Sequence, residues 1–191
     1  MKRILILCLC FLVTTVVGIR IYYVNSDVEI IPLETYSINE WVSLDGCFQD
    51  VSDENTSGYS VRVLDFSWIP YAEFVSKYGE SEDYLSSYRP KMILDVTFEF
   101  KNENNTTGRI ELFQYTVEGD FFTLSPNSDL WKLTVPQGEG AMGFVLEPNT
   151  SYEFHVPYIF FQNHQIELSG KDCQIIVSRA PIKKVIKFTI N

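Results

Sequence analysis

The chain has 191 residues, of which 46% are hydrophobic and 15% aromatic, so neither a disordered protein nor a low-complexity tail is indicated. Its formal net charge is −10, and no cluster of basic residues offsets that charge. Because such a surface repels phosphate backbones, the protein is not expected to bind nucleic acid.

Residues 1–24 have the pattern of an export signal. Lys2 and Arg3 precede an uncharged apolar run over residues 4–18. Apolar residues resume up to Val24, and a helix over this longer run would measure about 31 Å, enough to cross a membrane. The preferred interpretation is an uncleaved anchor with its N-terminus in the cytoplasm. A signal peptide cleaved after Gly18 is the alternative, which would give a secreted protein.

Residues 25–40 are polar and contain Pro32, which predicts a stalk or lead-in between the anchor and a domain over residues 41–191. Within that domain, the segment over residues 92–100 shows the clearest alternation of apolar and polar side chains, typical of a half-buried strand. Its expected hairpin partner lies over residues 110–117. Further strands are expected over residues 151–156 and 185–190 and, from weaker patterns, over residues 41–48, 59–68, 131–135, 142–146 and 173–178.

One segment departs from the strand pattern. Pro70 begins a run of helical spacing that Gly79 ends, and the segment continues to Pro90, so a helical insertion over residues 70–89 is predicted. Large aromatic residues are concentrated here. Because aromatic rings are favoured in interfaces, the insertion is a candidate interaction surface, with the contact residues Tyr71, Tyr84 and Tyr88. The alternative is that its aromatic residues attach the helix to the domain.

Many short strands separated by turns predict a mainly β fold, an antiparallel sandwich or a barrel. The absence of regularly alternating helical patterns argues against a parallel α/β sheet. We expect a β-sandwich of immunoglobulin-like topology with a short helical insertion.

Cys47 and Cys173 are the only cysteines beyond the leader. Export to an oxidising compartment would allow a disulfide bond between them. Two unrelated buried thiols are the alternative, because the sequence does not fix the distance between the two side chains.

The sequence carries no recognised catalytic or metal-binding motif. His155 and His164 are its only histidines, and they belong to no zinc-binding spacing, so no metal or other cofactor is expected. There is also no GxSxG nucleophile elbow, and we expect no enzyme activity. Four asparagines start Asn-X-Ser/Thr sequences at predicted turns, which indicates surface positions: Asn55, Asn104, Asn105 and Asn149.

Several short sequences together resemble a known family. They are YSVRV at residues 59–63, the aromatic-rich segment at residues 71–78, HVPY at residues 155–158 and VSRAPIKK at residues 177–184. The chain is similar to uncharacterised exported proteins of Firmicutes that carry a domain of unknown function. The strand over residues 94–100 that runs into Asn102 is also similar to immunoglobulin-like extracellular domains of the immunoprotective-antigen type. The resemblance implies a β-sandwich outside the cell, and it implies no activity and no site residues.

These observations favour an exported, membrane-anchored module that binds an unknown protein or cell-envelope component. One alternative is an accessory subunit of a membrane complex that uses the anchor helix itself. Another is an envelope hydrolase that acts through carboxylates the sequence does not identify.

Overall fold

The computed structural model describes the chain over residues 2–26, 30–50, 54–86, 88–135, 142–160 and 168–190. It contains two compact units, Met1–Ile31 and Pro32–Asn191. The first unit holds the helix α1 (Lys2–Ser26), which has exposed apolar side chains along its length. Among the described residues α1 is the one helix long and apolar enough to cross a membrane.

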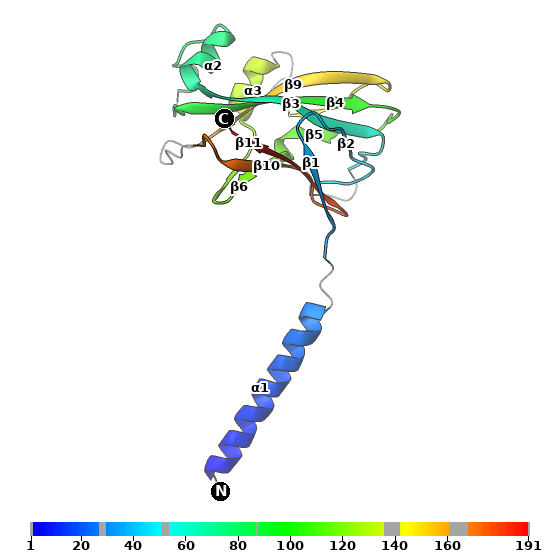
Figure 1. Cartoon of the computed structure of the whole chain (residues 1–191), viewed down its shortest axis with the longest axis vertical. Helices are drawn as coiled ribbons and strands as arrows, with labels where there is room; N and C mark the ends of the chain where they lie inside the picture. Colours follow the sequence, from blue (N-terminus) through cyan, green and yellow to red (C-terminus); the bar gives the residue numbers. More distant parts are fainter. Residues whose placement is uncertain are drawn as a thin grey trace. The chain divides into compact units, whose positions relative to one another are not determined.

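The second unit is mainly β, as predicted, and its strands form two principal sheets that lie in separate layers (Figure 1). In spatial order, the first sheet consists of β1 (Leu33–Ser37), β11 (Lys183–Thr189), β10 (Asp172–Ser178), β6 (Val117–Gly119) and β7 (Phe122–Leu124). The second consists of β2 (Val42–Ser43), β3 (Tyr59–Pro70), β4 (Met92–Asn102) and β9 (Thr150–Ile159). All pairs within the two sheets are antiparallel except β1 with β11. A small third sheet pairs β5 (Ile110–Glu111) with β8 (Gly143–Phe144).

The two principal sheets share one hydrophobic core. Alternation along β4 directs Phe98 and Phe100 into it, and β10 and β11 contribute Ile175 and Ile186 from the other sheet. The ring of Phe100 meets that of Phe144 edge-on, with centroids 5.1 Å apart, a favourable aromatic geometry. Strands predicted from alternation over residues 92–100, 151–156 and 185–190 are therefore confirmed as β4, β9 and β11.

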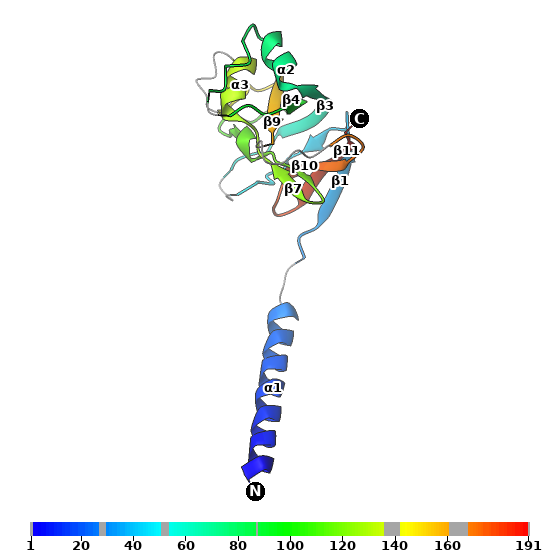
Figure 2. The same cartoon turned by 90° about the vertical axis from the view of Figure 1, so that its left-hand side faces the viewer.

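Two short helices cover one end of the second sheet. The helix α2 (Tyr71–Lys77) follows Pro70 as predicted, although it is shorter than the predicted insertion. It lies beside α3 (Ser128–Thr134), as both views show (Figures 1 and 2). A second apolar cluster lies between these helices and the sheet, made of Tyr71, Phe74 and Val75 from α2, Leu85, Leu130 from α3, Ile93 from β4 and Ile159 from β9.

The structure corrects three predictions about secondary structure. The predicted stalk over residues 25–40 contains β1, which pairs in parallel with β11 from Leu33↔Lys183 to Ser37↔Lys187. The predicted strand over residues 131–135 is largely helical, since α3 ends at Thr134 and the Asn127 side chain caps it by accepting a hydrogen bond from the Leu130 N–H. The predicted hairpin partner of β4 is also wrong, because β4 pairs with β3 and β9.

Buried asparagines hold the turn that follows β4. The Nδ2 of Asn102 donates to the carbonyl oxygens of Asn105 and Leu146, at 2.8 and 2.6 Å. Asn105 in turn donates to the Asn55 carbonyl at 2.9 Å and accepts from the Gly108 N–H at 2.6 Å. Asn105 is only 6% exposed, so the prediction that it lies on the surface is wrong. Its amide instead satisfies backbone groups that the turn would otherwise bury without partners.

Of the two possibilities for Cys47 and Cys173, a disulfide bond or two buried thiols, the structure has two free, buried thiols. Phe48 forms a β-bridge with Ala180, so Cys47 lies near the C-terminal end of β10, whereas Cys173 lies near its start. Five strand residues separate these ends, a distance of about 16 Å. A disulfide needs Cα atoms within about 7 Å, so the fold keeps these thiols apart.

A first prediction concerns the shared core. The substitution Phe100→Ala should lower the free energy of unfolding by about 3–5 kcal/mol, because it removes a buried ring and leaves a cavity. Tyr152→Ala is the matched control on the neighbouring strand, where the side chain is 55% exposed, and should cost less than about 1 kcal/mol. Urea unfolding of the full chain in detergent measures both values. Equal losses in the two variants would contradict a core centred on Phe100.

A second prediction concerns the thiols. Burial, with the nearby Asp172 and Asp120 carboxylates, raises the pKa of Cys173 to about 11. In a chain whose other cysteines are replaced by Ser, native Cys173 should therefore react slowly with Ellman's reagent at pH 8. Its rate should rise as the pH approaches that pKa, because the thiolate is the reactive form. The denatured Cys8→Ser/Cys10→Ser variant should show two free thiols without reduction, and finding none would demonstrate a disulfide.

Candidate functional site

The tyrosines predicted as an interaction surface attach the segment after α2 to the rest of the domain. Tyr71 is only 3% exposed, and its hydroxyl accepts a hydrogen bond from the Leu85 N–H at 3.1 Å, so it is not a surface contact. Tyr84 and Tyr88 are half-buried. The Tyr84 hydroxyl donates to the Asp129 carbonyl at 3.3 Å, and the Asn127 Nδ2 donates to the Tyr88 hydroxyl at 2.8 Å. Burial raises the pKa of Tyr84 and of Tyr88.

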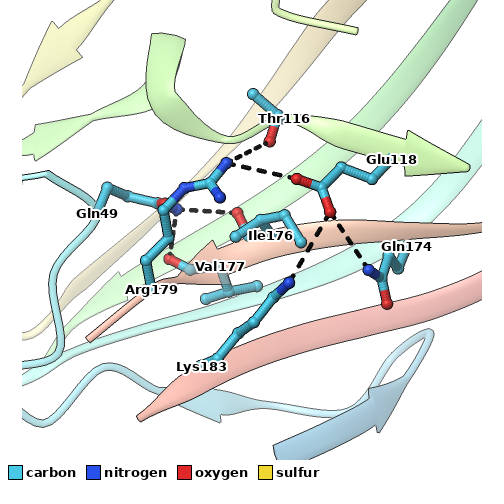
Figure 3. Close-up of polar contacts among 8 residues, drawn as sticks. All are labelled: Gln49, Thr116, Glu118, Gln174, Ile176, Val177, Arg179 and Lys183. Carbon is cyan, nitrogen blue, oxygen red and sulfur yellow. Dashed lines mark hydrogen bonds and ion pairs between the residues drawn. The ribbon is translucent and has the colours of Figure 1, made fainter. Parts of the chain in front are cut away.

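A polar cluster lies at the junction of β6, β10 and β11 in the first sheet (Figure 3). Its centre is Glu118, whose carboxylate lies 3.5 Å from the Arg179 Nη2 and 3.9 Å from the Lys183 Nζ, and accepts a hydrogen bond from the Gln174 Nε2 at 3.4 Å. Beside it, the Gln49 Nε2 donates to two carbonyl oxygens of β10 where the register shifts. The two cations of this cluster point toward the Glu118 carboxylate. These contacts join β6 to β10 and β11, which indicates a structural role.

A groove of about 590 Å3 adjoins this cluster. Glu118, Asp120, Asp172 and Lys187 line it, which gives it an excess of negative charge. The aromatic ring of its lining, Phe188, is only 7% exposed. A ligand in this groove would therefore meet three carboxylates and one amine, with no exposed aromatic ring beside them.

The outer face of the second sheet is polar along most of its length. The register places Arg62 of β3, Glu99 of β4 and Glu153 of β9 in one row across the sheet. The next row toward the end of β4 contains Lys101 and Ser151. Side chains that point away from the core along three strands thus form a continuous surface, because successive residues of a strand alternate between its faces.

This surface includes a groove of about 620 Å3, hereafter the Trp41 groove, lined by Trp41, Glu99, Lys101, Glu103, Asn149, Thr150 and Ser151. Trp41 is 37% exposed, and the Arg62 guanidinium lies over its indole ring at 4.5 Å. Glu99 holds that guanidinium with two contacts, at 2.6 Å to Nη2 and 2.8 Å to Nε. The indole therefore has a fixed neighbour, which limits its movement in the groove.

A second group of ionisable residues lies between the Trp41 groove and α2. Asp95 is 4% exposed, and its Oδ2 lies 3.4 Å from the His155 Nδ1 and 3.9 Å from the Lys77 Nζ. The Thr97 hydroxyl lies 3.3 Å from the same His155 nitrogen. In a catalytic triad the carboxylate and the nucleophile use different nitrogens of the imidazole. Asp95, His155 and Thr97 therefore do not have triad geometry.

Two buried oxygens in this group accept no hydrogen bond from the described residues, the Asp95 Oδ1 and the Tyr78 hydroxyl. Burial, with the Asp95 carboxylate, raises the pKa of Tyr78 to about 12. In the described part of the chain, no three His, Cys, Asp or Glu side chains are placed to hold a metal ion. His164 lies outside the described residues.

No motif in the sequence identifies the Trp41 groove. Trp41 begins a predicted strand, and Glu99 and Lys101 are simply the polar positions of the strand before the turn. They are brought together by the pairing of β2, β3, β4 and β9, which depends on contacts between distant residues. The only available signal was the predicted outward orientation of Glu99.

A third prediction follows from the role of Tyr88. Tyr88→Phe should lower the free energy of unfolding by about 1 kcal/mol, because it removes the hydrogen bond from Asn127 and keeps the ring. Tyr88→Ala should cost more, about 2 kcal/mol or above, because it also removes partly buried ring contacts. Thermal or urea unfolding of the full chain measures the difference. If both variants were as stable as the parent, Tyr88 would not attach this segment to the domain, and the prediction that it is an exposed contact residue would stand.

Neither the curated proteins nor the solved structures give a significant match. Residues 33–184 match the model of a family described as a domain of unknown function, DUF5028. The match begins at β1, reaches into β11 and excludes α1. The chain therefore belongs to the DUF5028 family.

Proposed function

We propose that this chain is a membrane-anchored binding module that displays its β domain outside the cytoplasm and binds its ligand in the Trp41 groove. The observation that carries the proposal is the exposed indole of Trp41, held by Arg62 beside the polar groups of the sheet. The groove thus combines one aromatic ring, which offers apolar contact, with polar side chains that can orient a ligand. The volume of about 620 Å3 also falls within the range of such sites.

The anchor and its orientation rest on α1. Its apolar side chains are exposed over its length, which suits contact with lipid. Lys2 and Arg3 at its start favour a cytoplasmic N-terminus by the positive-inside rule. Tyr22 and Tyr23 near its other end suit the membrane interface, where amphipathic rings are enriched. In this proposal the leader is retained as an anchor and is not cleaved.

An immunoglobulin-like arrangement is part of the proposal. The order β11-β10-β6-β7 matches the strand order G-F-C-C′ of a variable-type immunoglobulin sheet. The other sheet departs from that pattern, because β3 pairs with the next strand in the chain, β4. In the immunoglobulin fold the strand beside B comes later in the sequence. The proposed relationship is therefore one of layered architecture, with altered connections.

We favour a non-enzymatic module over an envelope hydrolase because the two carboxylates that line the Trp41 groove, Glu99 and Glu103, are each engaged by a cation, at 2.6 and 2.9 Å. Glycoside hydrolysis uses two carboxyl groups that act directly on the scissile bond. Asp95 and Thr97 also approach the same nitrogen of His155, which is not the geometry of a catalytic triad. An accessory subunit that acts through α1 is the other alternative. It predicts no dependence of binding on Trp41.

The fourth prediction tests orientation and site together. In a Cys8→Ser/Cys10→Ser chain, a membrane-impermeant maleimide should label Glu82→Cys in intact cells and label Lys2→Cys only after lysis. In nanodiscs, envelope fragments from the native host should slow the labelling of Ser151→Cys, which lies in the Trp41 groove. Labelling of Glu82→Cys should stay unchanged. Reversed labelling in cells would contradict the orientation, and an unprotected Ser151→Cys would contradict the binding site.

A further inference from the structure

We infer that the Trp41 groove takes an uncharged glycan. This inference rests on the proposed function, because it names the chemical class of ligand for the same groove. Three properties of the groove support it: the pairing of its charged side chains, its mixture of hydrogen-bonding groups and its one exposed aromatic ring.

Charge is the first property. Four of the charged side chains in and beside the groove form two pairs, Arg62 with Glu99 at 2.6 Å and Lys101 with Glu103 at 2.9 Å, and Glu153 lies opposite Glu99 in the same row. The charges within each pair cancel, so an uncharged ligand can bind while both pairs stay intact, and Glu153 adds one negative charge that disfavours an anion. An anionic ligand would compete with Glu99 and Glu103 for the two cations and would also meet the net charge of −10. A cationic ligand would compete with the cations for those two carboxylates.

The second property is the mixture of polar groups. Asn149 and Ser151 each offer both a donor and an acceptor, and Glu99 and Glu103 offer carboxylate oxygens that only accept. Sugar hydroxyl groups donate and accept, so they can pair with every one of these groups. A lipid chain could pair with none of them. The cores of protein interfaces are depleted in charged residues, so this lining does not suit a protein partner either.

The third property is the indole of Trp41. The residue is 37% exposed, and the part of the ring that Arg62 does not cover offers apolar surface to a ligand that is itself partly polar. A pyranose is such a ligand, because the C–H face of its ring is apolar and can pack against the indole. Because Glu99 fixes Arg62 and Arg62 lies over the indole, the ring is held before the ligand arrives, which reduces the entropy lost on binding.

The fifth prediction tests the ligand class by calorimetry on the full chain in nanodiscs, which avoids detergents with sugar headgroups. The neutral probes are hexamers of β-1,4-glucose, β-1,3-glucose and N-acetylglucosamine. The charged probes are a chitosan hexamer and a hexamer of galacturonic acid. At least one neutral hexamer should bind, with both charged hexamers weaker by about tenfold or more.

Variants locate the binding. Trp41→Ala should weaken capture of the neutral hexamer by about tenfold or more, as expected for a central aromatic contact. Glu99→Gln, which keeps the side-chain shape and loosens Arg62, should weaken it by a smaller factor. Tyr152→Ala is the control, an exposed ring that is paired with Phe100 and so lies on the other face of the same sheet from the groove, and should bind as the parent does. Unchanged binding by both Trp41→Ala and Glu99→Gln would overturn the site.

The outcomes separate this inference from the proposed function. Tighter binding of a charged hexamer, or no binding of any neutral hexamer, would overturn the uncharged glycan. If envelope fragments still protect Ser151→Cys in that case, the groove remains a binding site for another class of ligand. If the fragments do not protect it, the proposed function fails as well.

Discussion

The alternation of side chains along β4 determines both the stability of the domain and the chemistry of its surface. Paired with β3 on one side and β9 on the other, β4 directs Phe98 and Phe100 into the shared core. The residues between and beyond them, Glu99 and Lys101, face outward and line the Trp41 groove. A register shift by one residue would exchange the two sets, exposing aromatic rings and burying charges. The pairing that stabilises the core therefore also places the groove.

The buried asparagine network extends this constraint to the end of the groove. Asn102 lies between Lys101 and Glu103 in the chain, and its side chain is tied to the turn and to Leu146. The Glu103 N–H donates to the Gly58 carbonyl at 2.8 Å, which fixes the backbone of the same turn. Satisfying buried backbone groups thus positions two charged residues of the candidate site. At Gly108 a Cβ atom would lie 1.7 Å from the Asn55 carbonyl oxygen, so the turn requires glycine there.

Local patterns predicted the strands that alternate cleanly, β4, β9 and β11, and the start of α2, because these depend on neighbouring residues. They did not predict β1, whose partner β11 is about 150 residues away, so its pairing gives no local signal. They predicted a strand for residues 131–135, which are rich in β-forming side chains, and missed the Asn127 cap. Tyr71, Tyr84 and Tyr88 were predicted to lie on the surface. Their hydrogen bonds join them to residues elsewhere in the domain, and local sequence patterns do not reveal such contacts. The groove itself joins residues of several strands and could not be predicted from spacing.

The outer face of the second sheet is closed at one end and open at the other, and its composition explains the difference. Ile93 and Ile159 face outward at the start of β4 and need cover, which α2 and α3 provide. Asp95 comes next, and its buried Oδ2 lies 3.9 Å from the Lys77 Nζ of α2 and 3.4 Å from the His155 Nδ1. Beyond it the charged pairs are stable in water and need no cover. The apolar residues at the start of β4 are thus covered by α2 and α3. At the other end of the sheet the outward side chains are mostly polar, so the face around Trp41 stays accessible to a ligand.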